Sequence, residues 1–172
     1  MNTAPASAPS IASPRLLGLR ALLITVALLE FLNGLPNWIT MFGDVSTIPR
    51  PDMSTAIIQA HTAVYPVLAL AALVFAATGR VRYAIVALGA VVIMTWLSYM
   101  PSVLLYGLDF HSAGALRTPA QVMAFPLLGA SAIAFAVHNQ RLELPALLAC
   151  IPTLFNLIGL IGFLLGIRIH GF

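Results

Sequence analysis

Glu30 stands inside the apolar run LLEFLNGLPNW, residues 28–38, where an ionised carboxylate would be poorly solvated. Asn33 and Asn37 follow it three and seven residues later, so a helix places all three side chains on one face. A carboxyl group held away from water favours its neutral form and can act as a general acid near neutral pH. The spacing therefore predicts a polar site centred on Glu30.

A histidine in a second apolar run offers this carboxyl a partner for proton transfer. His61 and Tyr65 lie four residues apart, about one turn of a helix. We therefore expect Glu30 and His61 to be the catalytic pair of the site, if the site is catalytic. The residues expected to bind a ligand around this pair are Asn33, Asn37, Tyr65, Trp96, Tyr99, Ser102, Asp109, His111 and Asn156.

These residues also have a structural interpretation. As a neutral acid, Glu30 could bond to Asn156 or to a backbone carbonyl and hold helices together. His61 could be a neutral core histidine, and Trp38 and Tyr106 could belong to the aromatic belt at a membrane interface. The functional interpretation of Glu30 is preferred, because glutamine would supply the same hydrogen bonds without a titratable group.

The composition indicates the class of protein that positions these side chains. Of 172 residues, 60% are hydrophobic and only 8% are charged, and the mean hydropathy is +1.00. Soluble domains carry about 25% charged residues, whereas a membrane-spanning helix needs about 20 apolar residues. We predict an all-α, polytopic membrane bundle in one domain, 15–172, after a disordered tail, 1–14. The five predicted spans are 21–42, 54–78, 83–106, 119–138 and 145–168.

The arginines set the expected orientation. All eight basic residues are arginines, and no run of them forms a phosphate-binding stripe, which argues against nucleic acid as a partner. The positive-inside rule places the N-terminus in the cytoplasm. We expect this all-α bundle to lie in the cell inner (plasma) membrane. Five arginines flank the cytoplasmic side in this topology, Arg15, Arg20, Arg80, Arg82 and Arg141, and three flank the other side, Arg50, Arg117 and Arg168.

The polar side chains then fall between the midplane of the membrane and its periplasmic face. We therefore expect a polar pocket that opens to the periplasmic side. The loop from Gly107 to Thr118 is expected to cover the mouth of this pocket as a lid, because loops of this length are often functional.

Metal and haem chemistry receive little support. Asp109 and His111 lie two residues apart, with His61 and His170 expected on the same side, but the spacing matches no dedicated metal motif. No metal site is predicted. A haem would need facing histidines, and only ligation by His61 with His111 is conceivable. Cys150 is the only cysteine, so an intrachain disulfide is impossible, and a small buried hydrophobe is expected.

The predicted function is binding, with or without proton transfer, of a lipophilic or amphipathic small molecule such as a quinone. Three alternatives stay open: a membrane-embedded acid/base enzyme such as an isomerase or cyclase, an accessory subunit of a larger redox or transport complex, and a small transporter. The expected partners are the lipid bilayer and, through the small-residue face of Gly159, Gly162 and Gly166, a second copy or a partner membrane subunit. The sequence identifies no cofactor.

Overall fold

The computed structural model describes residues 14–43, 53–108, 120–138 and 141–170, and within these ranges it is helical with no strand. The all-α prediction is thus confirmed for the part described. The helices are α1 (Pro14–Gly43), α2 (Met53–Ala77), α3 (Val81–Tyr106), a short π-helix η2 (Ala120–Ala124) that continues into α5 (Phe125–His138), and α6 (Glu143–His170).

Among the described residues, five helices are long and apolar enough to cross a membrane, as the sequence predicted, and this is the architecture of a multi-pass membrane protein. Their apolar segments are Arg15–Pro36, Ala56–Ala77, Val81–Tyr106, Gln121–His138 and Glu143–Ile167. The first helix begins at Pro14 rather than at residue 21. Proline suits the first turn of a helix, and the long arginine side chains that follow can reach polar surroundings without interrupting the backbone.

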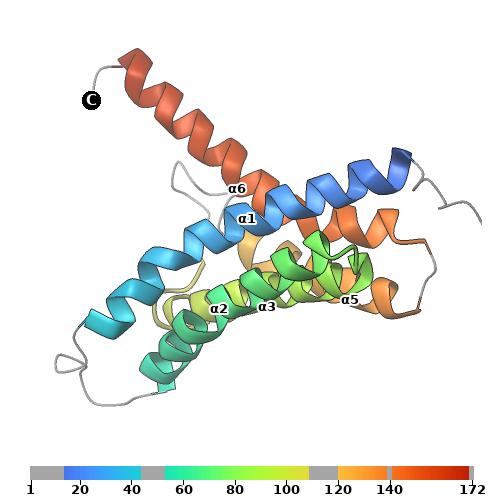
Figure 1. The fold of residues 1–172 in the computed structure, drawn as a ribbon. Coiled ribbons are helices and arrows are strands. Elements are labelled where there is room, and N and C mark those ends of the chain that lie inside the picture. Colours follow the sequence, from blue (N-terminus) through green and yellow to red (C-terminus); the bar gives the residue numbers. More distant parts are fainter. Residues whose placement is uncertain (1–13, 44–52, 109–119, 139–140, 171–172) are drawn as a thin grey trace, which may run out of the picture.

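The helices form a closed bundle in which each packs against the next (Figure 1). α1 contacts α2, α2 contacts α3, α3 contacts α5, α5 contacts α6, and α6 returns to α1. The core lies in the half of the bundle that contains the turn between α2 and α3. It is rich in alanine, which lets the helices approach closely; its members include Leu23, Val26, Ala27, Ala72, Ala76, Ile85, Leu88, Ala132, Ala146, Ala149 and Cys150.

The closest helix contact joins α3 to α5 at Gly89 and Gly129. A β-carbon at Gly89 would lie 2.7 Å from Ile133 Cγ1 and 3.0 Å from the carbonyl oxygen of Gly129. A β-carbon at Gly129 would likewise lie 3.0 Å from the carbonyl oxygen of Gly89. Small residues are therefore required here for the two backbones to touch.

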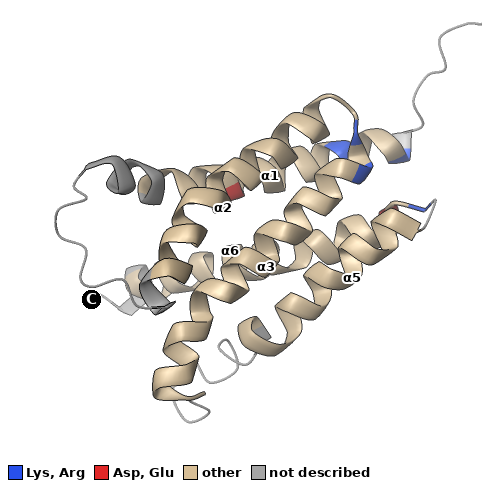
Figure 2. Cartoon of the chain, turned by 90° about the horizontal axis from the view of Figure 1, so that it is seen from below, with Lys and Arg blue, Asp and Glu red and all other residues tan. Residues whose placement is uncertain are grey.

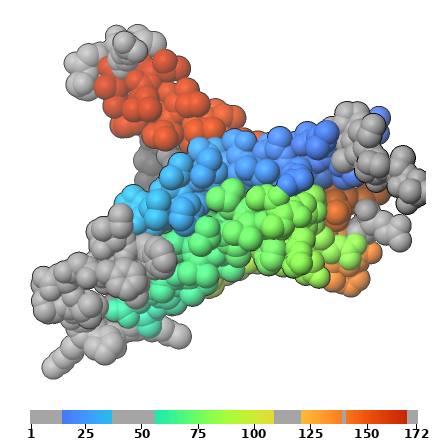
Figure 3. All heavy atoms as spheres, viewed as in Figure 1, coloured from blue at the N-terminus to red at the C-terminus, as the bar shows by residue number. Residues whose placement is uncertain are grey.

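The second half of α6, residues 158–167, diverges from the other helices (Figures 1 and 3). A β-carbon at Gly159, Gly162 or Gly166 would meet nothing within 4 Å. These glycines therefore pack against none of the described residues of their own chain. The large apolar side chains of this segment are about half exposed or more: Ile158, Leu160, Ile161, Phe163, Leu164 and Leu165.

Four of the long helices contain an internal proline, which removes one backbone N–H from the helix. These are Pro36 in α1, Pro66 in α2, Pro101 in α3 and Pro152 in α6. Because successive helices are antiparallel, Pro36, Pro66 and Pro101 lie in the half of the bundle opposite the alanine-rich core. Pro152 lies beside the core, two residues after Cys150. Three of the helices are therefore interrupted at the end opposite the core.

Basic side chains gather at the alanine-rich end of the bundle, where α1 begins and α2 turns into α3 (Figure 2). Arg20 closes the end of α2, because its guanidinium donates to the carbonyl oxygens of Ala76, at 3.0 Å, and of Ala77. Gly79 then takes a positive φ of 77°, which lets the chain reverse within a few residues. The two helices α2 and α3 are thus tied to α1 at this end.

Candidate functional site

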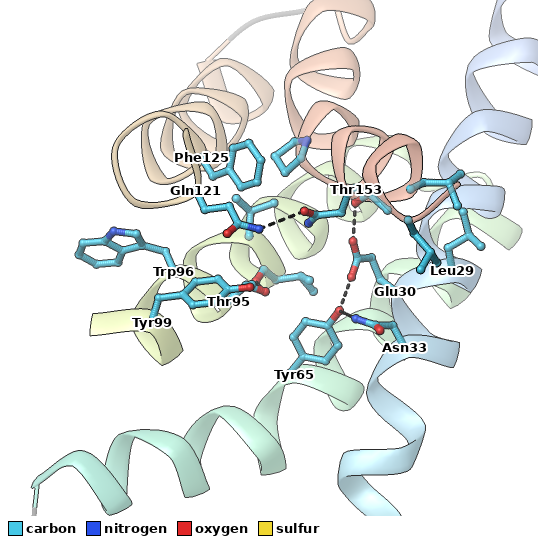
Figure 4. Close-up of a pocket in the computed structure, with 16 residues that line it drawn as sticks. Leu29, Glu30, Asn33, Tyr65, Thr95, Trp96, Tyr99, Gln121, Phe125 and Thr153 are labelled. Atoms are coloured by element: carbon cyan, nitrogen blue, oxygen red, sulfur yellow. Dashed lines mark hydrogen bonds between the residues drawn. The ribbon is translucent and has the colours of Figure 1, made fainter. Parts of the chain in front are cut away.

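A cavity of about 420 Å³ lies between α1, α2, α3, α6 and the junction of η2 with α5 (Figure 4). Its volume falls in the range of small-molecule binding pockets, about 300–1,000 Å³. Its polar lining is Glu30, Asn33, Tyr65, Thr95, Gln121, Thr153 and Asn156. Its aromatic and aliphatic lining is Trp96, Tyr99, Phe125, Leu29, Val91, Val92, Pro152, Leu157 and Leu160.

Glu30 lies at the centre of the hydrogen bonds in this cavity. Its carboxyl oxygens accept from the hydroxyls of Tyr65, on α2, and Thr153, on α6. Asn33 Nδ2 in turn donates to Tyr65 Oη at 3.2 Å (Figure 4). One carboxyl group therefore joins α1 to its neighbour α2 and to α6, the last helix of the chain.

A second polar pair lies on another wall of the same cavity. Gln121 Nε2, on η2, donates to Asn156 Oδ1, on α6, at 3.1 Å. Gln121 is only 8% exposed, so its amide group depends on this contact and on whatever occupies the cavity. The sequence suggested Asn156 as the structural partner of Glu30, but in the structure Thr153 holds the carboxyl and Asn156 pairs with Gln121.

Trp96 is held at the wall of the cavity by a backbone group of η2. Trp96 Nε1 donates to the carbonyl oxygen of Val122 at 2.9 Å. Trp96 is therefore fixed in orientation and presents its ring, rather than its N–H group, to the cavity.

The cavity brings together six of the predicted site residues: Glu30, Asn33, Tyr65, Trp96, Tyr99 and Asn156. His61 and Ser102 are outside its lining. The ring of His61 lies tilted by 46° against that of Tyr65, with 5.0 Å between the ring centroids. Its Nε2 is buried without a hydrogen-bond partner among the described residues. Tyr65 thus occupies the place beside Glu30 where His61 was expected.

Some predictions fall outside the part described. Asp109 and His111 lie there with the greater part of the expected lid, as does the side chain of Asn37. Among the residues that the structure describes, no three His, Cys, Asp or Glu side chains cluster as metal ligands would. Cys150 is fully buried and free, in agreement with the expected small core residue.

Sequence reasoning missed Thr153 and Gln121. Thr153 precedes Asn156 by three residues, so the two share a helix face, and this spacing could have identified Thr153 as part of the site. Gln121 is the one amide side chain near the start of the fourth predicted span. Polar groups within apolar helices usually face the protein interior, so its position could have identified it as part of the site.

Gly34 sets the position of Tyr65. A β-carbon at Gly34 would lie 2.8 Å from both Cδ1 and Cε1 of the Tyr65 ring. We expect Gly34→Ala to displace this ring and to destabilise the protein by about 1–3 kcal/mol, the usual range for overpacking. Thermal unfolding in detergent measures the effect.

Gly18→Ala is the matched control, because a β-carbon there meets nothing within 4 Å. Alanine is the better helix former, so this variant should unfold at the wild-type temperature or slightly above it. Equal melting temperatures for the Gly34→Ala and Gly18→Ala variants would contradict the positioning role of Gly34.

No protein-family model matches the chain, and no curated protein or solved structure matches it either. Its class is therefore defined by its own architecture. The chain is a small helical protein of the multi-pass membrane type, with a polar pocket around one carboxyl group.

Proposed function

We propose that this protein resides in the cell inner membrane and binds a small lipophilic or amphipathic molecule around Glu30. The observation that supports this most is a carboxyl group held by hydroxyls from two other helices, inside a cavity of about 420 Å³ with mostly apolar walls. A few convergent polar groups in an apolar cavity are typical of ligand sites. Ionisable residues within membrane helices are similarly typical of functional sites.

The surroundings of Glu30 suit the exchange of a proton. No lysine or arginine is among the side chains that line the described cavity, so an ionised Glu30 carboxylate would have no cationic partner there. An unpaired charge inside a membrane is disfavoured, so a carboxyl group in such a site is suited to take up a proton and to release it to a bound molecule. Hydroxyl groups both accept and donate, so Tyr65 and Thr153 can bond to the neutral acid as well as to the carboxylate.

The same proposal places the arginine-rich end of the bundle in the cytoplasm. The bias of arginines supports this orientation, and the pocket then lies nearer the periplasmic side. In a Cys150→Ala background, we expect Val81→Cys to react with an impermeant thiol reagent only after cells are permeabilised. Leu105→Cys is the control, because Leu105 is exposed at the other end of α3. It should react in intact cells, and the reverse pattern would invert the topology.

The binding function is tested with the purified protein. We expect an organic extract of the protein to contain a lipophilic compound in near-stoichiometric amount, and the protein freed of it to regain thermal stability when the compound is returned. Stabilisation by about 2.7 kcal/mol is expected at a ligand concentration 100 times Kd. Glu30→Ala should abolish this stabilisation. An extract that holds only bulk phospholipid, with no stabilising compound in it, would contradict the proposal.

A second candidate is an accessory subunit of a larger membrane complex. The observation that favours it is the exposed second half of α6, where the glycine face of Gly159, Gly162 and Gly166 contacts none of the described residues. Such a face suits close contact with another helix. Cysteine crosslinking from Gly162→Cys in native membranes tests it: a specific crosslinked protein supports this candidate, and reaction with no protein contradicts it.

A further inference from the structure

We infer that the molecule bound in this pocket has an uncharged, flat head that offers a carbonyl group in one form and a hydroxyl group in another, as a quinone and its quinol do. The inference rests on the proposed function and names the chemical class of its ligand. It concerns the binding of both forms and assigns no electron transfer to this chain.

The charge of the described lining disfavours an anionic head. Glu30 is the only acidic residue in the described lining, and no lysine or arginine lies beside it. The other polar groups of the lining are amides and hydroxyls. Phosphate and carboxylate heads are usually bound by arginine or lysine, which neutralise them. An anionic head would have no counter-charge here, whereas a neutral head can be held by the amide, hydroxyl and carboxyl groups of the lining.

The amide pair of Gln121 and Asn156 can meet either form of such a head. With Gln121 Nε2 donating to Asn156 Oδ1 at 3.1 Å, Asn156 Nδ2 remains to donate and Gln121 Oε1 remains to accept. If both amides rotate by half a turn, they still bond to each other and the remaining groups exchange places. The pair therefore offers a donor to a carbonyl oxygen or an acceptor to a hydroxyl at the same wall.

Glu30 has the same double capacity on another wall of the cavity. As a neutral acid it donates through its O–H and accepts through its other oxygen. Thr153 and Tyr65 hold it in place without taking all of its capacity, because each carboxyl oxygen has two lone pairs. Both ends of a dicarbonyl ring, or of the corresponding diol, thus find a partner that adapts to them.

The aromatic residues account for the flat shape of the proposed head. Trp96 has its N–H engaged by Val122 O, so its contribution to the cavity is its ring. Tyr99 lies beside it on α3, and Phe125 lies at the start of α5 (Figure 4). Aromatic side chains favour stacked or edge contacts with another ring. The aliphatic lining, Leu157 and Leu160, extends along α6 toward its exposed half and suits an apolar tail.

The test compares ligands that share one decyl chain and differ in the head. Trp38→Phe leaves Trp96 as the only tryptophan of the two, and quenching of its fluorescence reports binding. We expect a decyl-benzoquinone and its quinol to bind with Kd values within about threefold of each other. Decyl phosphate and decylamine do not quench tryptophan, so their binding is measured by displacement of the quinone. They should bind at least about tenfold more weakly, the loss expected when hydrogen bonds to the head are not made.

A variant tests the role of the amide pair. Gln121→Leu/Asn156→Leu removes both partners together and retains their size, so folding should survive. We expect it to weaken binding of the quinone and the quinol by about tenfold each. Thr25→Val is the control and should bind like the wild type, because the Thr25 hydroxyl bonds within its own helix, to Ala21 O, and lies outside the cavity lining.

The outcomes separate the inference from the proposed function. If decyl phosphate or decylamine binds as tightly as the quinone, the head is charged and the inference fails while the pocket keeps its function. Strong preference for one redox form would also overturn it. If none of these ligands binds and the protein extract holds no other lipophilic compound, the proposed function fails as well.

Discussion

Glu30→Ala is expected to destabilise the protein by about 2–4 kcal/mol and to abolish ligand binding, whereas Glu30→Gln folds like the wild type. Alanine leaves the hydroxyls of Tyr65 and Thr153 without their acceptor, and an unsatisfied buried group is destabilising by about 1–3 kcal/mol. Glutamine can accept from one hydroxyl and donate to the other. It cannot exchange a proton, so only proton-dependent function should be lost.

Unfolding in increasing SDS measures the stability difference, and infrared difference spectra test the protonation state. We expect a carbonyl band of a neutral carboxylic acid in the wild type that is missing in Glu30→Gln. Tyr65→Phe and Thr153→Val each remove one hydroxyl and should give smaller losses than Glu30→Ala. Should Glu30→Gln match the wild type in every binding and activity assay, Glu30 serves only to join the helices.

Gly89→Leu is expected to produce the largest loss of stability, about 3 kcal/mol or more. A β-carbon at this position already lies 2.7 Å from Ile133 Cγ1 and 3.0 Å from a backbone oxygen of α5, which cannot move aside as a side chain can. α3 and α5 must then separate. Trp96 on α3 and Phe125 on α5 both line the cavity. Separation of these two helices should therefore widen the cavity and lower ligand affinity.

Gly162→Leu provides the control for this prediction. It introduces the same side chain into a membrane-type helix, but a β-carbon at Gly162 meets nothing within 4 Å. We expect its unfolding transition in detergent to remain within about 0.5 kcal/mol of the wild type, as for other open sites. A loss at Gly162 equal to that at Gly89 would show that the added leucine, rather than the helix contact, causes the effect.

The helices could be predicted from the sequence because their signal is local. Long apolar runs bounded by glycine, proline and arginine determine the five long helices and most of their bounds. The face shared by Glu30 and Asn33 also follows from spacing alone. The first helix begins at Pro14, earlier than the predicted span at residue 21. The arginines Arg15 and Arg20 end the apolar run, but they do not interrupt the helix.

The partners of Glu30 could not be predicted, because they depend on which helices become neighbours and how they rotate. A histidine and a tyrosine one turn apart are equally plausible partners by spacing. The choice of Tyr65 depends on Gly34, whose missing side chain lets the tyrosine ring rest on α1. Likewise, Thr153 and Gln121 are ordinary residues in sequence, and only the packing of α6 against α1 and η2 gives them their roles.

The distribution of prolines has a mechanical consequence. At the alanine-rich end α1, α2 and α3 are continuous and clamped by Arg20 and the close contact of α3 with α5, so this end is stiff. At the other end Pro36, Pro66 and Pro101 each remove one backbone hydrogen bond from their helix. A helix bends most readily where such a bond is missing. We therefore expect this end of the bundle to yield to an entering molecule more easily than the alanine-rich end.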